Sequence, residues 1–132
     1  MTIRHSLTLD LPAFLSELFA QIDRYQDLGP NWDGEGALPI ERKVVLRAKN
    51  LLQLIATRAT SLGLRWENPS VAPNPDGALE LAWEKDDRWV MLIIEPGQSK
   101  VGCATQEHGT EPRYRSLSKD EAIGQVLWAI RG

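Results

Sequence analysis

The spacing of the hydrophobic residues changes near Asn68, and this change limits the folds open to the chain. Before Asn68, two segments repeat apolar residues every three or four positions, which is typical of helices that bury one face. After it, short β-favouring runs alternate with turn residues until a last helical segment. Because one-sided helices and strands must cover each other, the pattern predicts an α+β domain.

Two N-terminal helices are expected. The first starts near Pro12 and ends near 28–30, where Gly permits a left-handed exit and Pro cannot continue the helix. Its apolar stripe comprises Leu11, Phe14, Leu15, Leu18, Phe19, Ile22 and Tyr25. The second is expected to have Pro39 at its first position, Glu41 in its first turn and Gly63 at its end. Its stripe comprises Val44, Ala48, Leu51, Leu52, Ile55, Ala59 and Leu62.

The second half predicts an antiparallel meander. Turn residues at 74–77, 85–87 and 96–99 separate the apolar runs. We expect strands over 78–83, 89–94, 100–105 and 113–117, and a further strand over 2–9, where polar and apolar residues alternate. The run Trp89–Ile94 is apolar on both faces, which places it centrally and predicts that something covers each side of it.

A final helix is predicted from Ser118-Lys119-Asp120-Glu121, which matches a capping box. Its stripe comprises Ala122, Ile123, Val126, Leu127 and Ile130. Trp128 projects nearly opposite that stripe, so either a neighbouring loop covers it or it marks an interface. The elements together predict one domain over 1–132, in which an antiparallel sheet of four to five strands packs against two N-terminal helices, with a C-terminal helix.

Charge and composition narrow the function classes. The 132 residues carry a formal net charge of −3, which gives no general attraction to nucleic acid or anionic lipid. The longest apolar run falls far short of the roughly 20 residues that span a bilayer. Cys103 is the only cysteine, which excludes an internal disulfide and favours a cytoplasmic location. The N-terminal residues lack the apolar block of a signal peptide.

The loop between the first two helices, Asn31–Ala37, is the densest unusual stretch. Trp32 offers a large apolar surface beside Asp33, Gly34 and Glu35, so the loop is a candidate recognition anchor. Alternatively, Trp32 plugs the end of the helical pair while the glycines make the turn. Calcium is not expected, because the loop lacks the further acidic ligands of an EF-hand.

Basic residues gather on one face of the second expected helix, at Arg42, Lys43, Arg47 and Lys49, with Arg58 beside them. This face could dock an acidic partner protein or follow phosphates. A charged, solvated helix face is the simpler explanation, because no aromatic residues lie between the basic ones.

Catalytic chemistry is sparse. His5 lies on the apolar side of its expected strand, as a core histidine would. Cys103 and His108 could form a nucleophile and base, but a strand cysteine is more commonly an inert apolar residue. Glu107, His108 and Glu111 share one loop, yet a catalytic metal usually needs three well-placed ligands and the chain has two histidines. We therefore expect neither a cofactor nor a metal ion.

Two segments carry a family resemblance: Trp32-Asp33-Gly34-Glu35-Gly36-Ala37-Leu38-Pro39-Ile40, and Pro69 to Trp83 with its Pro75-Asp76-Gly77 turn. Over about residues 28–96 the chain resembles a widespread group of small bacterial proteins that share these two motifs in this order. The group brings no assigned activity, so the resemblance supports the domain assignment. Physically, the second motif specifies a hairpin, with prolines holding an extended approach and Asp-Gly supplying the turn.

The leading hypothesis is a non-enzymatic interaction module of the bacterial cytoplasm, such as an accessory, antitoxin-like or immunity-like protein. It would bind a protein partner or form a homodimer, through the Trp32 loop and Trp128, with no membrane contact. The competing hypothesis is a ligand-binding protein or enzyme whose pocket lies between the Trp32 loop and the strand ends, using Asp33, Glu35 or His108. Nucleic-acid binding through Arg42, Lys43 and Arg47 is a third, less favoured hypothesis.

Overall fold

The computed structural model describes residues 13–131. The expected strand over 2–9, His5, Leu11 and the helix start at Pro12 lie outside the described residues. The elements, in chain order, are α2 (Ala13–Gln26), α3 (Arg42–Ser61), β1 (Ser70–Pro73), β2 (Leu79–Lys85), β3 (Arg88–Ile94), β4 (Val101–Glu107), β5 (Arg113–Leu117) and α4 (Lys119–Arg131).

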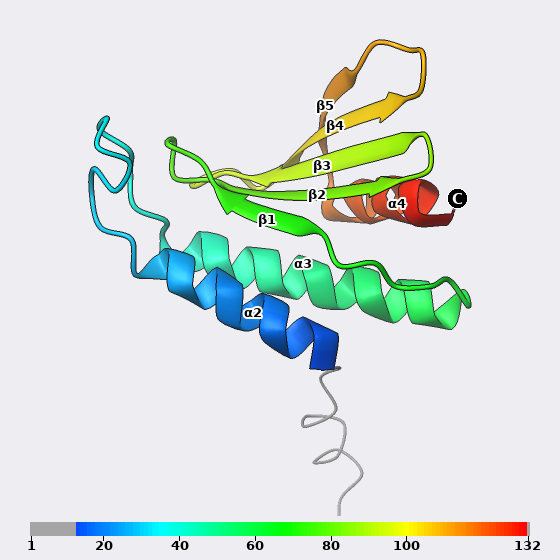
Figure 1. Cartoon of the computed structure of the whole chain (residues 1–132), viewed down its shortest axis with the longest axis horizontal. Coiled ribbons are helices and arrows are strands. Elements are labelled where there is room, and N and C mark those ends of the chain that lie inside the picture. Colours follow the sequence, from blue (N-terminus) through cyan, green and yellow to red (C-terminus); the bar gives the residue numbers. More distant parts are fainter. Residues whose placement is uncertain (1–12, 132) are drawn as a thin grey trace, which may run out of the picture.

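The strands form one five-stranded antiparallel sheet in the order β1-β2-β3-β4-β5. The predicted α+β fold is confirmed. Figure 1 shows the helices on one side of the sheet: α4 lies against β2 to β5, α3 lies against β2 and β3, and α2 packs on α3. The expected packing differs in one respect, because α4 rather than α2 covers most of the sheet.

The second helix starts later than predicted. Helix α3 begins at Arg42, with Glu41 as an extended N-cap at φ −72° and ψ 150°, so Pro39 lies outside the helix. The reason is tertiary: the Leu38 N–H donates to the Pro75 carbonyl at 2.9 Å, which keeps this segment extended. At the other end Gly63, with φ +71°, stops the helix as predicted. Leu62 was expected in the apolar stripe, but as the C-cap it is 57% exposed.

The helix-facing side of the sheet forms the core. Leu79, Leu81 and Trp83 of β2 are buried, as their alternation predicted. Trp83 anchors an aromatic cluster that closes one end of the core: Trp66 meets it edge-on at 6.5 Å between ring centroids, and Phe14 stacks on Trp66 at 5.5 Å. The Trp83 indole donates to the Glu67 carbonyl at 3.0 Å, which satisfies its N–H inside the core.

The opposite side of the sheet is uncovered within residues 13–131 (Figure 1). This side is called the open face below. It bears Trp89, Met91 and Ile93 of β3, all half-buried. The prediction that β3 is central is confirmed, but the expected cover on both sides is found on the helix side only, because all three described helices pack there.

The two edges of the sheet differ. The Val71 carbonyl of β1 accepts hydrogen bonds from the Tyr25 hydroxyl at 2.9 Å and the Gln21 amide at 3.4 Å, and Pro73 has no N–H to offer. The β1 edge is therefore occupied by α2. At the other edge, four of the five residues of β5 are exposed, and no described strand lies outside it. Strand β5 is the open edge of the sheet.

The predicted capping box at the start of α4 is confirmed. The Glu121 N–H donates to the Ser118 hydroxyl at 3.2 Å, and the Ser118 N–H donates to the Glu121 carboxylate at 2.9 Å. Hydrogen bonds from the backbone and side chain of Ser118 hold the pKa of Glu121 below its ordinary value.

A substitution at Ser118 tests this cap. We expect Ser118→Ala to lower the free energy of unfolding by about 1 kcal/mol in urea denaturation at neutral pH, because an N-cap hydroxyl is lost. Since the folded pKa of Glu121 is lowered, its contribution is present above the unfolded pKa of about 4.3 and is lost as the pH falls through the folded pKa. Glu121→Gln should therefore weaken the pH dependence in that window. Unchanged stability in Ser118→Ala would contradict the cap.

Candidate functional site

Four neighbouring strands give the open face an apolar centre. In the register of the sheet, Ala82, Met91, Ala104 and Tyr114 form one row across β2 to β5. Tyr114 is 71% exposed, although it is one of the largest side chains of the sheet. Trp89 and Ile93 flank Met91 along β3. Tyr114 is exposed, Trp89, Met91 and Ile93 are half-buried, and no described helix covers them. Because apolar side chains gathered on one uncovered face can mark an interaction site, this face is the leading contact surface of the described chain.

A trench crosses the open face beside this row. The next row of the sheet runs from Ile93 through Gly102 to Ser116, so two small residues separate Ile93 from the β5 edge. A Cβ at Gly102 would lie 3.3 Å from the Cβ of Ile93, so the Ile93 side chain stands directly beside the trench that Gly102 leaves open. The cavity measures about 490 Å³; its lining also includes Tyr114 and the polar rim residues Glu95, Gln98 and Lys100.

The helix-facing side of β5 carries two arginines, Arg113 and Arg115, whereas Tyr114 and Ser116 lie on the open face. Both are exposed, and the two ion pairs found among the described residues, Lys49–Asp23 and Arg58–Asp120, involve neither of them. They border a hollow of about 220 Å³, whose other lining residues include Glu107, Glu111 and Trp128. Strand β5 therefore separates two hollows, one on each side of the sheet.

Trp128 is half-buried at the end of α4, covered on one side by Arg88. The guanidinium carbon of Arg88 lies 5.0 Å from the centre of the indole ring, and its Nη1 donates to the Trp128 carbonyl at 2.7 Å. Lys85 donates to the Ile130 carbonyl at 3.0 Å. These two cations satisfy the last carbonyls of α4, where a helix favours positive charge. Trp128 is thus covered in part, and its free side faces the hollow beside β5.

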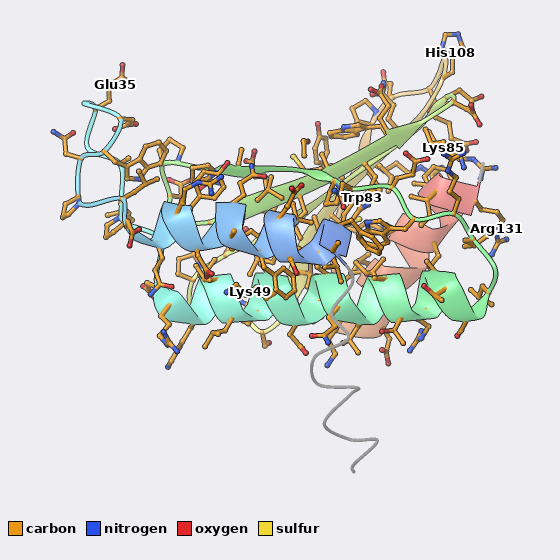
Figure 2. The ribbon with its side chains drawn as sticks, turned by 60° about the horizontal axis from the view of Figure 1, so that its bottom comes forward. Glu35, Lys49, Trp83, Lys85, His108 and Arg131 are labelled. Carbon is orange, nitrogen blue, oxygen red and sulfur yellow. The ribbon has the colours of Figure 1, made fainter. Side chains whose placement is uncertain are left out.

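The Trp32 loop uses most of its polar groups on its own backbone. The Trp32 indole donates to the Leu38 carbonyl at 2.8 Å. The Asp33 carboxylate accepts from the N–H groups of Glu35 and Ala37 at 2.8 and 3.0 Å. Gly34, at φ +78°, adopts a left-handed conformation that the turn requires. The contacts favour the structural explanation of this loop, and Glu35 projects from its tip into solvent (Figure 2).

The two motifs of the resemblance meet in space. Besides the bond from Leu38 to Pro75, Gly77 in the β1–β2 turn lies against the other segment: a Cβ there would be 3.3 Å from the Pro39 carbonyl oxygen. Ala37 and Ile40 are buried at this junction. Packing of the first loop on the second turn therefore explains both motifs without a ligand.

The basic face of α3 is largely engaged within the molecule. Arg47 donates to the Glu95 carbonyl at 3.0 Å and thereby holds the β3–β4 turn, and Lys49 pairs with Asp23 of α2. Arg42 and Lys43 are exposed at the start of the helix. The structure thus does not gather these side chains into one free basic patch, which leaves nucleic-acid binding with less support.

The catalytic candidates do not come together. Cys103 is buried in β4, whereas His108 is exposed in the turn after that strand, five residues on, or about 16 Å along an extended chain. Figure 2 places His108 and Glu35 at opposite ends of the molecule, so they cannot serve one site. Across residues 13–131, no three His, Cys, Asp or Glu side chains are arranged to hold a metal ion. No helix in that range is long and apolar enough to cross a bilayer.

Cys103 should react slowly with thiol reagents. Burial raises the pKa of its thiol, and the nearby Arg115 lowers it by a smaller amount. Because the thiolate is the reactive form, we expect modification by Ellman's reagent at pH 8 to be at least about tenfold slower in the folded chain than in guanidinium chloride. Equal rates in the two solvents would show that the thiol is accessible and would contradict the assigned burial.

Comparison of the chain with protein-family models, with curated proteins and with solved structures found no match. The geometry alone therefore carries the functional argument. Sequence reasoning named Trp32, Asp33, Gly34, Glu35, Trp128, Arg42, Lys43 and Arg47, whereas the open face adds Trp89, Met91, Ile93 and Tyr114. The signal for these lies in the two apolar faces of β3, which alone predict a strand covered on both sides.

Proposed function

We propose that this chain is a non-enzymatic protein-interaction module, of the kind that an accessory, antitoxin-like or immunity-like protein of the bacterial cytoplasm would use. Its partner is a different protein, which presents an apolar surface to Trp89, Met91 and Ile93. The observation that carries the proposal is the open face, which bears large apolar side chains on the central strand. Burial of such a face would gain about 25 cal/mol for each Å² removed from water.

Charge helps to choose between a partner protein and a second copy. Glu80 and Glu84 of β2 lie on the open face with Ala82, whereas Arg113 and Arg115 lie at the β5 edge on the helix-facing side of the sheet. A partner with an apolar centre and acidic residues toward β5 complements this arrangement. A second copy pairing along β5 would instead bring arginines together, so the homodimer is the less favoured occupant.

A ligand pocket beside Trp32 has less support. The indole N–H and the Asp33 carboxylate already bond to the loop backbone, and the 490 Å³ cavity is lined by β3, β4, β5 and the turn between β3 and β4. Its wall residues Ile93 and Tyr114 belong to the open face, so the same surface serves the interaction proposal.

The test compares two surfaces of the same chain. The double variant Met91→Gln/Ile93→Thr keeps residues compatible with a strand but makes the open face polar. The control Leu62→Gln changes an equally apolar, 57% exposed residue at the end of α3. A protein retained by the wild type from a lysate of the source cells is purified, and its affinity for all three chains is measured by calorimetry.

We expect the double variant to lose at least about tenfold in affinity and the control to lose nothing, because contact energy concentrates in a few central apolar residues. Equal affinity of all three chains would contradict the proposal. Sedimentation of the pure chain completes the test. If the wild type is a dimer and the double variant is a monomer, the open face binds a second copy of the chain, and the proposal of a different partner protein is wrong.

A further inference from the structure

We infer that the partner adds an extended, acidic segment to the outer side of β5, as a sixth strand of the sheet. The inference rests on the proposed function and names how the partner binds. Three independent features of β5 support it. Its outer backbone edge pairs with no strand of residues 13–131, its two arginines lie in neither ion pair of that range, and a trench opens on the other side of the sheet.

The first feature is the backbone of β5. In an antiparallel sheet alternate residues of an edge strand direct their N–H and C=O groups outward, where another strand can pair with them. At the β1 edge, the Tyr25 hydroxyl and the Gln21 amide occupy the Val71 carbonyl, and Pro73 removes a donor. Strand β5 has neither device, since its five residues are Arg-Tyr-Arg-Ser-Leu and no described element lies beyond them. Of the two edges of the described sheet, β5 is therefore the one at which an added strand can pair.

The second feature is charge. Arg113 and Arg115 project on the helix side of the sheet, in register with Thr105 and Cys103. They lie in neither of the ion pairs of residues 13–131. Glu107 and Glu111 lie in the same hollow near the β4–β5 turn, and, besides the hydrogen bonds from Ser118, the nearby Arg115 lowers the pKa of Glu121. Both arginines nevertheless stay exposed and able to meet a further carboxylate. An acidic side chain of the added strand would pair with one of these arginines, whereas strand β5 of a second copy would bring arginines close to them.

The third feature is the trench on the open face. The row Ile93, Gly102 and Ser116 has its two small members toward the β5 edge, so the trench is open to that side. A strand has side chains that alternate between its two faces. If the acidic residues of an added strand lie beside Arg115, their neighbours lie on the open face, where an apolar side chain can enter the trench next to Tyr114. Recognition of alternate side chains in pockets is typical of strand addition.

The experiment selects peptides on the whole chain. A displayed library of random twelve-residue peptides is selected on immobilised wild type and counter-selected on Arg113→Glu/Arg115→Glu. We expect enrichment of sequences in which Asp or Glu alternates with apolar residues. The best peptide is then made in two forms, with N-methyl groups on either the odd-numbered or the even-numbered residues. The form whose methyl groups face β5 should lose at least about tenfold in affinity, because it cannot donate its N–H groups to that strand, and the other form should lose much less.

Two variants locate the bound peptide. Ser116→Trp fills the mouth of the trench from an exposed position and should weaken binding, whereas Leu62→Gln should not change it. Enriched peptides without acidic alternation, or equal affinity of both methylated forms, would overturn the added strand. If the purified partner still depends on Met91 and Ile93 but not on Arg113 and Arg115, the proposed function stands and this inference fails. If it depends on neither pair, both fail.

Discussion

Replacing Trp83 by Ala should lower the free energy of unfolding by about 3–5 kcal/mol, the largest stability effect of any substitution considered for this chain. Trp83 is 2% exposed, its ring meets Trp66 edge-on, and its indole N–H donates to the Glu67 carbonyl. The alanine variant removes these contacts, opens a cavity under the sheet and leaves a carbonyl without its partner. Urea denaturation followed by circular dichroism measures the loss.

Trp89→Ala is the matched control, because it removes the same side chain from the same sheet on the open face. Trp89 is half-buried, and none of the described helices lies over it. We therefore expect it to cost less than half as much as Trp83→Ala. Equal losses in the two variants would mean that the open face is packed like the core, and they would contradict the assignment of that face as a surface for contact.

Gly77→Ala should be the second most damaging of these substitutions, with a loss of about 2–3 kcal/mol. Two effects add at this position. The backbone has φ +83°, which a side chain rarely adopts, and the new Cβ would lie 3.3 Å from the Pro39 carbonyl oxygen. The Trp32 loop would have to move away from the β1–β2 turn, so the variant tests the junction between the two motifs.

Gly97→Ala separates the two effects. Gly97 has a similar φ of +74°, but nothing lies within 4 Å of the position its Cβ would take. It should therefore lose about 1–2 kcal/mol, from backbone strain alone. The comparison is made by urea denaturation at one pH. If both alanine variants lose the same amount, the contact between Gly77 and Pro39 is not tight, and the junction does not explain the motifs.

Local signals in the sequence predicted most of the fold. The alternation of Leu79, Leu81 and Trp83, the stop at Gly63 and the reciprocal bonds of Ser118 and Glu121 each depend on residues within a few positions. For such features, spacing and capping chemistry are sufficient. The antiparallel order of β2 to β5 followed as well, because short turns between consecutive strands favour a meander. Strand β1, Ser70–Pro73, was not among the expected strands.

Features that depend on distant contacts were missed. Pro39 is a reasonable first residue of a helix, but a hydrogen bond between Leu38 and Pro75 holds its segment extended. Trp32 resembles a recognition anchor until its N–H is seen to bond Leu38. For β3, a strand with two apolar faces can be covered on both sides or can present one face to a partner, and no local pattern distinguishes these. The open face could therefore be located only once the helices were placed.

Amide hydrogen exchange of the chain, alone and bound to its purified partner, tests the central claim most directly. Bound partner should slow exchange at the outward N–H groups of Arg113–Leu117 and leave the Trp32 loop, 31–37, unchanged. Protection confined to the Trp32 loop, with β5 exchanging at the rate of the free chain, would contradict the account and return the contact surface to the loop.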